Sequence, residues 1–270
     1  MYRPYQIDWQ GHGYFTPSLY PPVPPDLSHL HSEWSALQYH FALARQGEFG
    51  RLGELIEIAR ETQSGMMQQY FLYLLSDAAP FSTLRQLADD ALDSWYPEYP
   101  VEVAIALIHS GILSLVPDVL ELYARRVDHA TSLPLTLSFR LEPTPGLVAE
   151  KLPEDDDAEI YTAKIAEYHA QLTTHMGRAD SPVLQGELMG VRRLAELYLD
   201  ALADREYAWR WSKYRRFFEA ATGIDMSDCY EARNTKPLTA AAKLEAFLSS
   251  PEAQRYEHGV RYFWGHRIPE

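Results

Sequence analysis

The 270-residue chain has a single cysteine, Cys229, so no disulfide can form within it and folding does not require an oxidising compartment. It also lacks a long uninterrupted apolar run. The most apolar stretch, residues 101–120, contains Glu102, His109 and Asp118 and is too polar to span a membrane. The first residues show no apolar core or small-residue cleavage site of a signal peptide. These absences predict a soluble, cytoplasmic protein without a membrane partner.

Lysine is absent from residues 1–150, which hold 8 arginines against 18 aspartates and glutamates, a balance of −10. Residues 151–270 hold 16 basic and 20 acidic side chains, and the whole chain has a formal net charge of −14. An acidic field disfavours non-specific nucleic-acid binding and favours encounter with a basic partner, so we expect no nucleic-acid partner. The same charge could serve solubility alone, and composition leaves that alternative open.

Local catalytic motifs are also missing: there is no nucleophile elbow, P-loop, dinucleotide fingerprint, H-E-x-x-H, paired C-x-x-C or EF-hand loop. Two groups of metal-ligand types do lie on expected helices. The first is spread over about three helical turns, too far for one ion, and the intervals of the second do not stack on one helix face. The groups are His29, Glu33 and His40, and Glu167, His169 and His175. We therefore expect no catalytic residue, no metal site and no cofactor. A metal-dependent hydrolase built from dispersed histidines and carboxylates is a remaining alternative.

Helical periodicity dominates from residue 26 onward, with apolar residues three and four positions apart and glycines or prolines at the expected breaks. Pairs of such segments recur about every 30 to 35 residues, although no strict repeat consensus is present. The pattern predicts an all-α protein, an α-solenoid-like stack of antiparallel helix pairs of the HEAT-like kind.

Proline content divides this predicted fold into parts. Residues 1–25 contain six prolines and should form an extended arm, whereas 129–157 contain four more and should form a long mid-chain loop. We expect a single elongated domain over 1–270, with a first helical half at 26–128 and a second at 158–270 that ends in a C-terminal cap.

Two groups of acidic residues are candidates for binding a partner. One lies on the outward face of the helix expected to begin after an N-cap at Ser82, and the other ends the mid-chain loop. An anionic loop could enter a basic cleft, although carboxylates there could also cap the following helix and complement its dipole. The first group could equally be a solvated helix face. The candidates are Asp89, Asp90, Asp93, Glu154, Asp155, Asp156 and Asp157.

Residues 205–219 mix basic and aromatic side chains in a way that could suit a nucleic acid. The aromatic residues Tyr207, Trp211, Tyr214 and Phe218, however, fall four, three and four positions apart. That spacing places them on one helical stripe and predicts core packing.

The chain's end carries a resemblance to a known family. The segments YRRFFEAATGIDMSDCY (214–230) and TAAAKLEAFLSSPEAQRYEHGVRYFWGHRIP (239–269) resemble the C-terminal part of helical-repeat immunity proteins that bacteria encode beside polymorphic toxins. The resemblance implies a non-catalytic protein that binds and blocks one cognate toxin. A helical scaffold or adaptor would use the same binding physics. Arginine supplies 19 of the 24 basic residues, which suits a GC-rich bacterial genome.

The last residues also have a structural interpretation that needs no resemblance. Several large apolar side chains there are costly to leave in water, and the terminal repeat of a solenoid needs a cap. Gly265 permits a sharp turn and Pro269 stops a helix. We therefore predict a sealing plug, formed by Val260, Tyr262, Phe263, Trp264 and Ile268.

Overall fold

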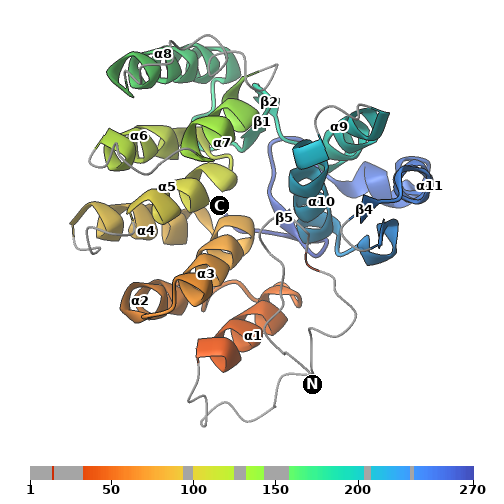
Figure 1. Ribbon diagram of the computed structural model, residues 1–270, viewed down its shortest axis with the longest axis horizontal. Helices are drawn as coiled ribbons and strands as arrows, with labels where there is room; N and C mark the ends of the chain where they lie inside the picture. The colour runs from red at the N-terminus through yellow and green to blue at the C-terminus, as the bar shows by residue number, and fades with distance from the viewer. Residues whose placement is uncertain are drawn as a thin grey trace. The chain divides into compact units, whose positions relative to one another are not determined.

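A computed structural model of the chain describes residues 14, 33–93, 100–124, 132–142, 158–203, 208–231 and 234–270. This described part is mostly helical, with eleven α-helices and three two-stranded sheets (Figure 1), so the all-α class is confirmed. The chain divides into two compact units. Unit 1 comprises Met1–Phe49 and Gly190–Ile268, and unit 2 comprises Gly50–Met189 and Pro269–Glu270. The single elongated domain stays a prediction.

Unit 2 contains seven helices in its described residues. They pack in two rows, because α3 contacts α5 and α5 contacts α7, while α4 contacts α6 and α6 contacts α8 (Figure 1). The elements are α2 (Glu54–Glu61), α3 (Gly65–Ala78), α4 (Phe81–Asp93), α5 (Pro100–His109), α6 (Val116–Ala124), α7 (Ser132–Leu141), α8 (Ala158–Met176), β1 (Val183–Leu184) and β2 (Glu187–Leu188).

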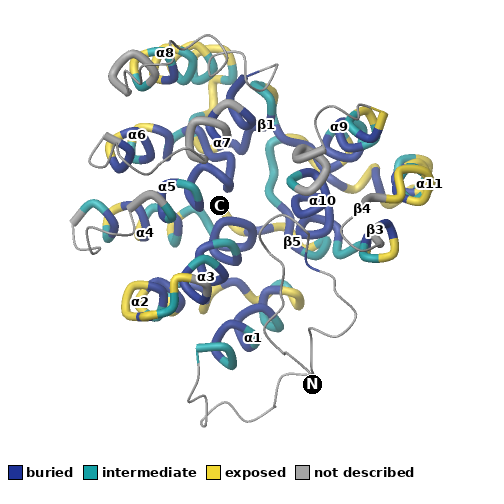
Figure 2. Tube along the Cα trace, in the orientation of Figure 1, coloured by how far each residue is buried: buried dark blue, intermediate teal, exposed yellow. Residues whose placement is uncertain are grey.

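Amphipathic patterning accounts for these helices. On α2, Leu55, Ile56 and Ala59 are buried on one face while glutamates occupy the exposed face (Figure 2). The following helix α3 is buried along most of its described length, and Ser64 caps it by accepting a hydrogen bond from the Met67 N–H. This serine satisfies one of the N–H groups that have no partner within the helix.

Two sequence-based boundaries are wrong in unit 2. Residues 132–141 form α7, so the expected loop over 129–157 is interrupted by a helix that buries Leu137, Phe139 and Leu141. Pro134 falls in the first turn of α7, where its missing N–H would have no helical acceptor. Ser82 is not the N-cap of α4, since it lies inside the first turn of a helix that begins at Phe81.

Residues 181–190 also depart from the helical pattern predicted for the second half of the chain. They contain an antiparallel hairpin, in which Val183 pairs with Leu188 and Leu184 pairs with Glu187. Its turn has positive φ at Gln185 (53°) and Gly186 (72°), as a tight two-residue hairpin turn requires. Gly186 therefore favours a hairpin turn at this point, because glycine adopts a positive φ without steric cost.

In its described residues, unit 1 combines one helix from the N-terminal part of the chain with three helices from the C-terminal part. In it α9 packs on α10 and α11, and β5 packs against α10. The elements are α1 (Glu33–Ala44), α9 (Val191–Ala203), α10 (Ala208–Thr222), β3 (Tyr230–Glu231), β4 (Asn234–Thr235), α11 (Pro237–Leu248), β5 (Tyr262–Phe263) and β6 (His266–Arg267). The predicted aromatic stripe of α10 is buried at Tyr214 and Phe218. Residue 207 and the Trp211 side chain lie outside the described part.

The C-terminal segment forms a hairpin whose turn caps α10. Trp264 (φ 50°) and Gly265 (φ 75°) make the turn, and their N–H groups donate to the carbonyls of Ala220 (2.7 Å) and Ala221 (2.8 Å). The last carbonyls of a helix have no N–H donor within the helix, so the turn supplies donors to two of them. Of the predicted plug residues, Tyr262, Phe263 and Ile268 are buried, while Val260 and Trp264 are half-buried.

Candidate functional site

The structure places only part of the predicted acidic surface. Asp89 is exposed and Asp90 is half-buried, both on α4. Asp93 ends α4, but its side chain lies outside the described part, as do residues 154–157 and almost all of the predicted N-terminal arm. The partner-binding role of both acidic groups therefore stays a prediction.

Asp89 forms an ion pair with the guanidinium of Arg85. Arg85 donates from Nη2 to Asp89 (2.8 Å) and reaches both carboxylate oxygens of Asp118 on α6 (2.7 and 2.8 Å). The pKa of Arg85 is raised, first by the hydrogen bond to Asp118 and also by Asp89. The fork-shaped contact with Asp118 bridges α4 and α6, so Arg85 has a structural role and offsets part of the local negative charge.

The exposed face of α2 adds further carboxylates to unit 2. Glu54, Glu57 and Glu61 are exposed there. Arg51 lies 2.7 Å from Glu54, and Arg60 lies 3.7 Å from Glu57. Exposed pairs of this kind contribute little to stability, and both partners remain accessible to another molecule.

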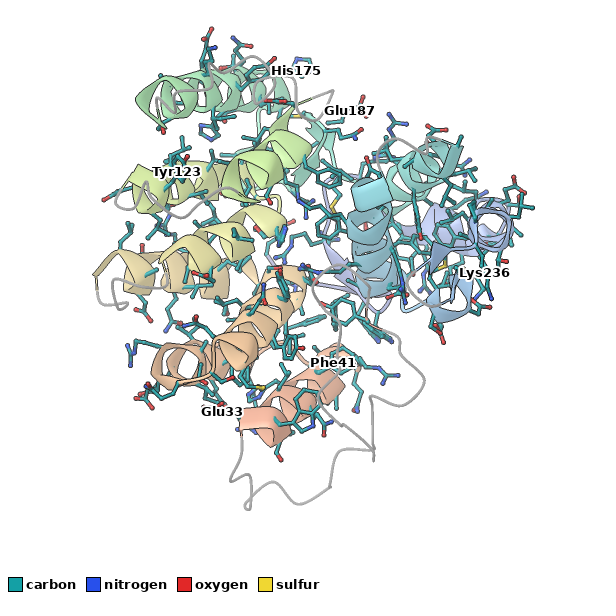
Figure 3. All side chains as sticks on the ribbon, viewed as in Figure 1. Glu33, Phe41, Tyr123, His175, Glu187 and Lys236 are labelled. Carbon is teal, nitrogen blue, oxygen red and sulfur yellow. The ribbon has the colours of Figure 1, made fainter. Side chains whose placement is uncertain are left out.

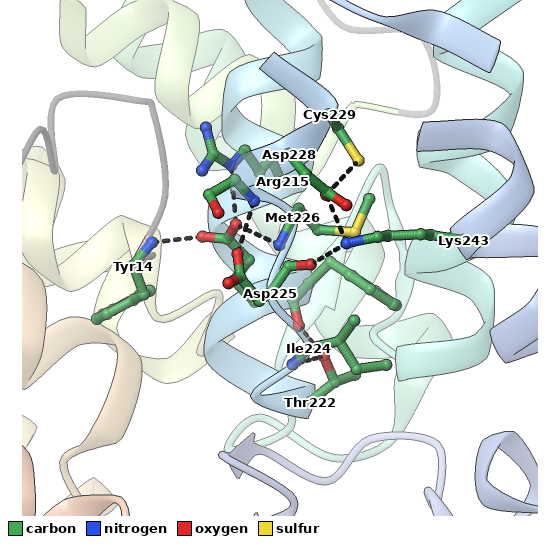
Figure 4. A network of polar contacts seen from close by, with 12 residues as sticks. Tyr14, Arg215, Thr222, Ile224, Asp225, Met226, Asp228, Cys229 and Lys243 are labelled. Carbon is green, nitrogen blue, oxygen red and sulfur yellow. Dashed lines mark hydrogen bonds and ion pairs between the residues drawn. The ribbon is translucent and has the colours of Figure 1, made fainter. Parts of the chain in front are cut away.

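A buried carboxylate forms a polar centre in unit 1 (Figure 4). Glu219 lies on α10 one turn after Arg215, and both side chains are almost completely buried. The Arg215 Nε–H donates to Glu219 Oε1 (2.8 Å), and the Met226 N–H donates to the same oxygen (3.1 Å). The Tyr14 N–H donates to Oε2, across 205 residues of sequence. The carboxylate thus connects α10, the segment after it and a residue near the N-terminus.

Burial changes the acidity of this group. Desolvation raises the pKa of Glu219 to about 7, and the nearby charge and hydrogen bond of Arg215, followed by the N–H groups of Tyr14 and Met226, oppose that rise. Three donors facing one carboxyl group, with no acceptor among them, favour the ionised form that burial disfavours. Glu219 is therefore poised between two protonation states near neutral pH.

An aromatic enclosure surrounds Tyr14, and we call it the Tyr14 niche: Phe41 of α1, Glu219 of α10, and Phe263 and Trp264 of the C-terminal hairpin. The Tyr14 ring stacks on Phe41 at 5.7 Å and an interplanar angle of 8°. It meets the rings of Phe263 (5.7 Å, 80°) and Trp264 (5.3 Å, 86°) edge to face. Tyr14 is only 1% exposed as a result.

The lone cysteine, Cys229, follows the Glu219 centre in unit 1, and its thiol has low reactivity. Lys243 donates to Asp228, and the Cys229 thiol lies 3.5 Å from the same carboxylate (Figure 4). Burial, followed by the negative charge of Asp228, raises the pKa of the Cys229 thiol to about 11. Since only the thiolate is a good nucleophile, Cys229 is unsuited to nucleophilic catalysis in this state.

The histidines considered as metal ligands have separate surroundings. His40 is buried with Nδ1 2.8 Å from the Ala36 carbonyl, and His169 places Nε2 2.8 Å from the Leu113 carbonyl. Burial lowers the pKa of His169. His175 is exposed at the end of α8 (Figure 3), and residue 29 lies outside the described part. Among the described residues, no group of three or more His, Cys, Asp or Glu side chains could hold a metal ion.

No sequence motif marks Tyr14, Arg215 and Glu219 as one centre. The available signal was the four-residue separation of Arg215 and Glu219 within a helix whose other stripe is aromatic. Tyr14 carries no comparable signal, because its partners follow it in sequence by 27 to 250 residues.

Comparison with protein-family models, curated proteins and solved structures finds no match to this chain. Within the described ranges, no helix combines the length and apolar character needed to cross a membrane. The function has to be inferred from the residues of this chain itself.

Proposed function

We propose that this protein is a non-catalytic binding protein, a cytoplasmic bacterial immunity protein that binds and neutralises a cognate toxin with a basic surface. The observation that carries the proposal is the −10 charge balance of residues 1–150, which contain no lysine. Such a field raises the rate of encounter with a basic protein and discourages binding to nucleic acid. The C-terminal resemblance to immunity proteins directs the proposal to a toxin.

Exposed carboxylates of unit 2 support this assignment. Asp89 on α4 and three glutamates on α2 are accessible to a partner. We assign the partner surface to the acidic groups singled out in the sequence, with the α2 face as an addition. Those groups are Asp89, Asp90, Asp93, Glu154, Asp155, Asp156 and Asp157. Carboxylates at the rim mainly accelerate association, so slow dissociation would require an apolar or aromatic anchor as well.

The arrangement of unit 2 suits a binding platform. We propose that α3–α8 form a short HEAT-like solenoid, in which α3, α5 and α7 make one row and α4, α6 and α8 make the other. Contacts within and between these rows support the proposal. Stacked helix pairs offer extended surfaces that commonly bind other proteins.

The perturbed ionisable groups of unit 1 support a role without catalysis. Glu219 has donors on both oxygens, and burial holds the Cys229 thiol in its protonated form. Perturbed pKa values also occur in structural networks, and these two groups fit that case.

Co-expression with the product of the neighbouring gene tests the proposal. We expect that product to arrest growth of a bacterial host alone, and growth to be restored when this chain is co-expressed. The control is the same plasmid with an early stop codon in the gene for this chain. The purified pair should elute as a stable complex, measured by size-exclusion chromatography with light scattering.

Two outcomes would redirect the assignment. Growth arrest that persists despite full expression of this chain, with no complex formed, would overturn the immunity function. A neighbouring product that forms a complex but is not toxic would instead favour the scaffold or adaptor. Stoichiometric zinc or manganese in the purified chain, together with hydrolytic activity, would favour the hydrolase.

A further inference from the structure

The Tyr14 niche recognises backbone as well as side chain. Glu219 accepts the Tyr14 N–H, a group that every residue except proline can present. The rings of Phe41, Phe263 and Trp264 contact the Tyr14 ring on its face and its edges. A carboxylate for the peptide N–H and three rings for an aromatic side chain are the components of a peptide-recognition site.

The aromatic residues of the niche also contact one another. Phe41 meets Phe263 (6.1 Å, 82°) and Trp264 (5.1 Å, 87°) edge to face, and the rings of Phe263 and Trp264 lie 5.0 Å apart. Arg45 lies over the rings of Phe41 and Trp264, at 5.6 and 5.3 Å from their centroids. These contacts connect the walls of the niche without involving Tyr14.

Glu219 and the Trp264 turn, which complete the niche, also have hydrogen-bond partners other than Tyr14. Besides the Tyr14 N–H, Glu219 accepts hydrogen bonds from Arg215 and Met226. The turn at Trp264 remains fixed by its hydrogen bond to the Ala220 carbonyl on α10. A preorganised site of this kind binds a ligand at low cost in conformational entropy.

We propose that the Tyr14 niche is a peptide-binding site selective for an aromatic residue, which Tyr14 occupies in cis and which an aromatic residue of a partner protein's peptide segment can occupy in its place. Eighteen residues, 15–32, connect Tyr14 to the start of α1. A residue of the same chain competes with a peptide in solution at an effective concentration that is on the order of millimolar for short connections. The site does not require the partner to be a toxin.

A labelled peptide tests this site without any partner protein. The peptide carries residues 9–19, WQGHGYFTPSL, and its binding to full-length wild type and to full-length Tyr14→Ala is measured by fluorescence anisotropy. We expect at least tenfold tighter binding to Tyr14→Ala, because the substitution vacates the ring position. The matched control protein is Tyr73→Ala, which alters a tyrosine in unit 2 and should bind as weakly as wild type.

Two altered peptides separate recognition from general stickiness. N-methylation at the tyrosine removes the N–H that Glu219 accepts, and replacement of the tyrosine by alanine removes the ring. Each change should weaken binding to Tyr14→Ala by about tenfold or more. Undiminished binding of the N-methylated peptide, or equal binding of the parent peptide to Tyr14→Ala and wild type, would overturn the proposal.

Folding of the variant is checked by circular dichroism before binding is measured. If Tyr14→Ala does not fold, Tyr14→Leu replaces it, since leucine keeps apolar bulk but lacks the ring. Binding of the same peptides to Tyr14→Leu is then measured, and binding to wild type is measured at millimolar peptide concentration. If the parent peptide binds neither the folded variant nor wild type at that concentration, Tyr14 is only a structural residue.

Discussion

At the scale of single residues, the chemistry of the chain is concentrated in buried ionisable groups with backbone partners. Arg140, 1% exposed, donates to the carbonyls of His109 and Val183 and so connects α5, α7 and the first hairpin strand. Glu219 performs a similar connecting role in unit 1, and its protonation should register in the stability of the protein.

The pH dependence of stability should contain a contribution from Glu219. Its pKa is about 7 when folded, against an ordinary value of 4.5, so the folded state retains a proton that the unfolded state releases. The stability contributed by this proton is fully present below pH 4.5 and is lost as pH rises to about 7. Relative to Glu219→Gln, the wild-type free energy of unfolding should fall over that window by an amount on the order of 3 kcal/mol.

Urea unfolding of both proteins at half-unit intervals from pH 4 to pH 8.5 measures this difference. Glu196→Gln, a half-exposed position on α9, serves as the control and should show a much smaller slope. A difference between wild type and Glu219→Gln that is flat between pH 4.5 and 7 would contradict the raised pKa.

Gly111 is a second residue whose role is set by geometry. Its φ is +77°, and an added Cβ would lie 2.7 Å from the Val183 carbonyl oxygen. Gly111→Ala should therefore lower the free energy of unfolding by about 2 to 3 kcal/mol. Gly65→Ala is the matched control, because Gly65 begins α3 with no atom near the added Cβ, and its stability should change by less than about 1 kcal/mol. Equal stability of the two variants would show that Gly111 is not constrained.

At the scale of elements, the C-terminal hairpin contributes both backbone and side-chain contacts. Its turn caps α10, and Phe263 is completely buried against the rings of Phe41 and Trp264. The hairpin is therefore part of the core of unit 1.

Removing one side chain of this hairpin should have a large effect. Phe263→Ala is expected to reduce the free energy of unfolding by about 3 to 5 kcal/mol, through lost apolar burial and the cavity left behind. Leu238→Ala provides the comparison, since Leu238 is 87% exposed on α11 and should change stability by less than about 0.5 kcal/mol. Denaturant titration measures both, and a Phe263→Ala effect as small as that of Leu238→Ala would contradict the plug.

Helix periodicity predicted most elements because it depends on neighbours within one turn. The helical periodicity found from residue 26 onward corresponds to α2, α3, α4 and α11, among other helices. The exceptions have local causes. The Leu-x-Leu pattern of 133–137 resembles a strand, and Gly186 has the positive φ of a hairpin turn within a segment that otherwise has a helical pattern. The Tyr14 niche could not be predicted, because residues separated by more than 200 positions meet there only after the chain has folded.

At the scale of the whole molecule, negative charge is unevenly distributed along the sequence. Residues 1–150 carry a balance of −10, whereas residues 151–270 carry −4. Net charge alone would affect association with a basic partner wherever the charges lie. A localised acidic surface would make association depend on particular carboxylates, and this difference is measurable.

The most direct test of the acidic-surface account is the association rate constant of the purified chain with its partner, measured by stopped-flow at low and at physiological salt. Asp155, Asp156 and Asp157 are changed together to lysine and compared with the same change at Asp200, Glu245 and Glu252, exposed residues of unit 1. We predict association about tenfold slower at low salt, with a flatter salt dependence, for the first variant, and a much smaller change for the second. Equal rates for wild type and the first variant, or equal slowing in both variants, would contradict a partner surface formed by these carboxylates.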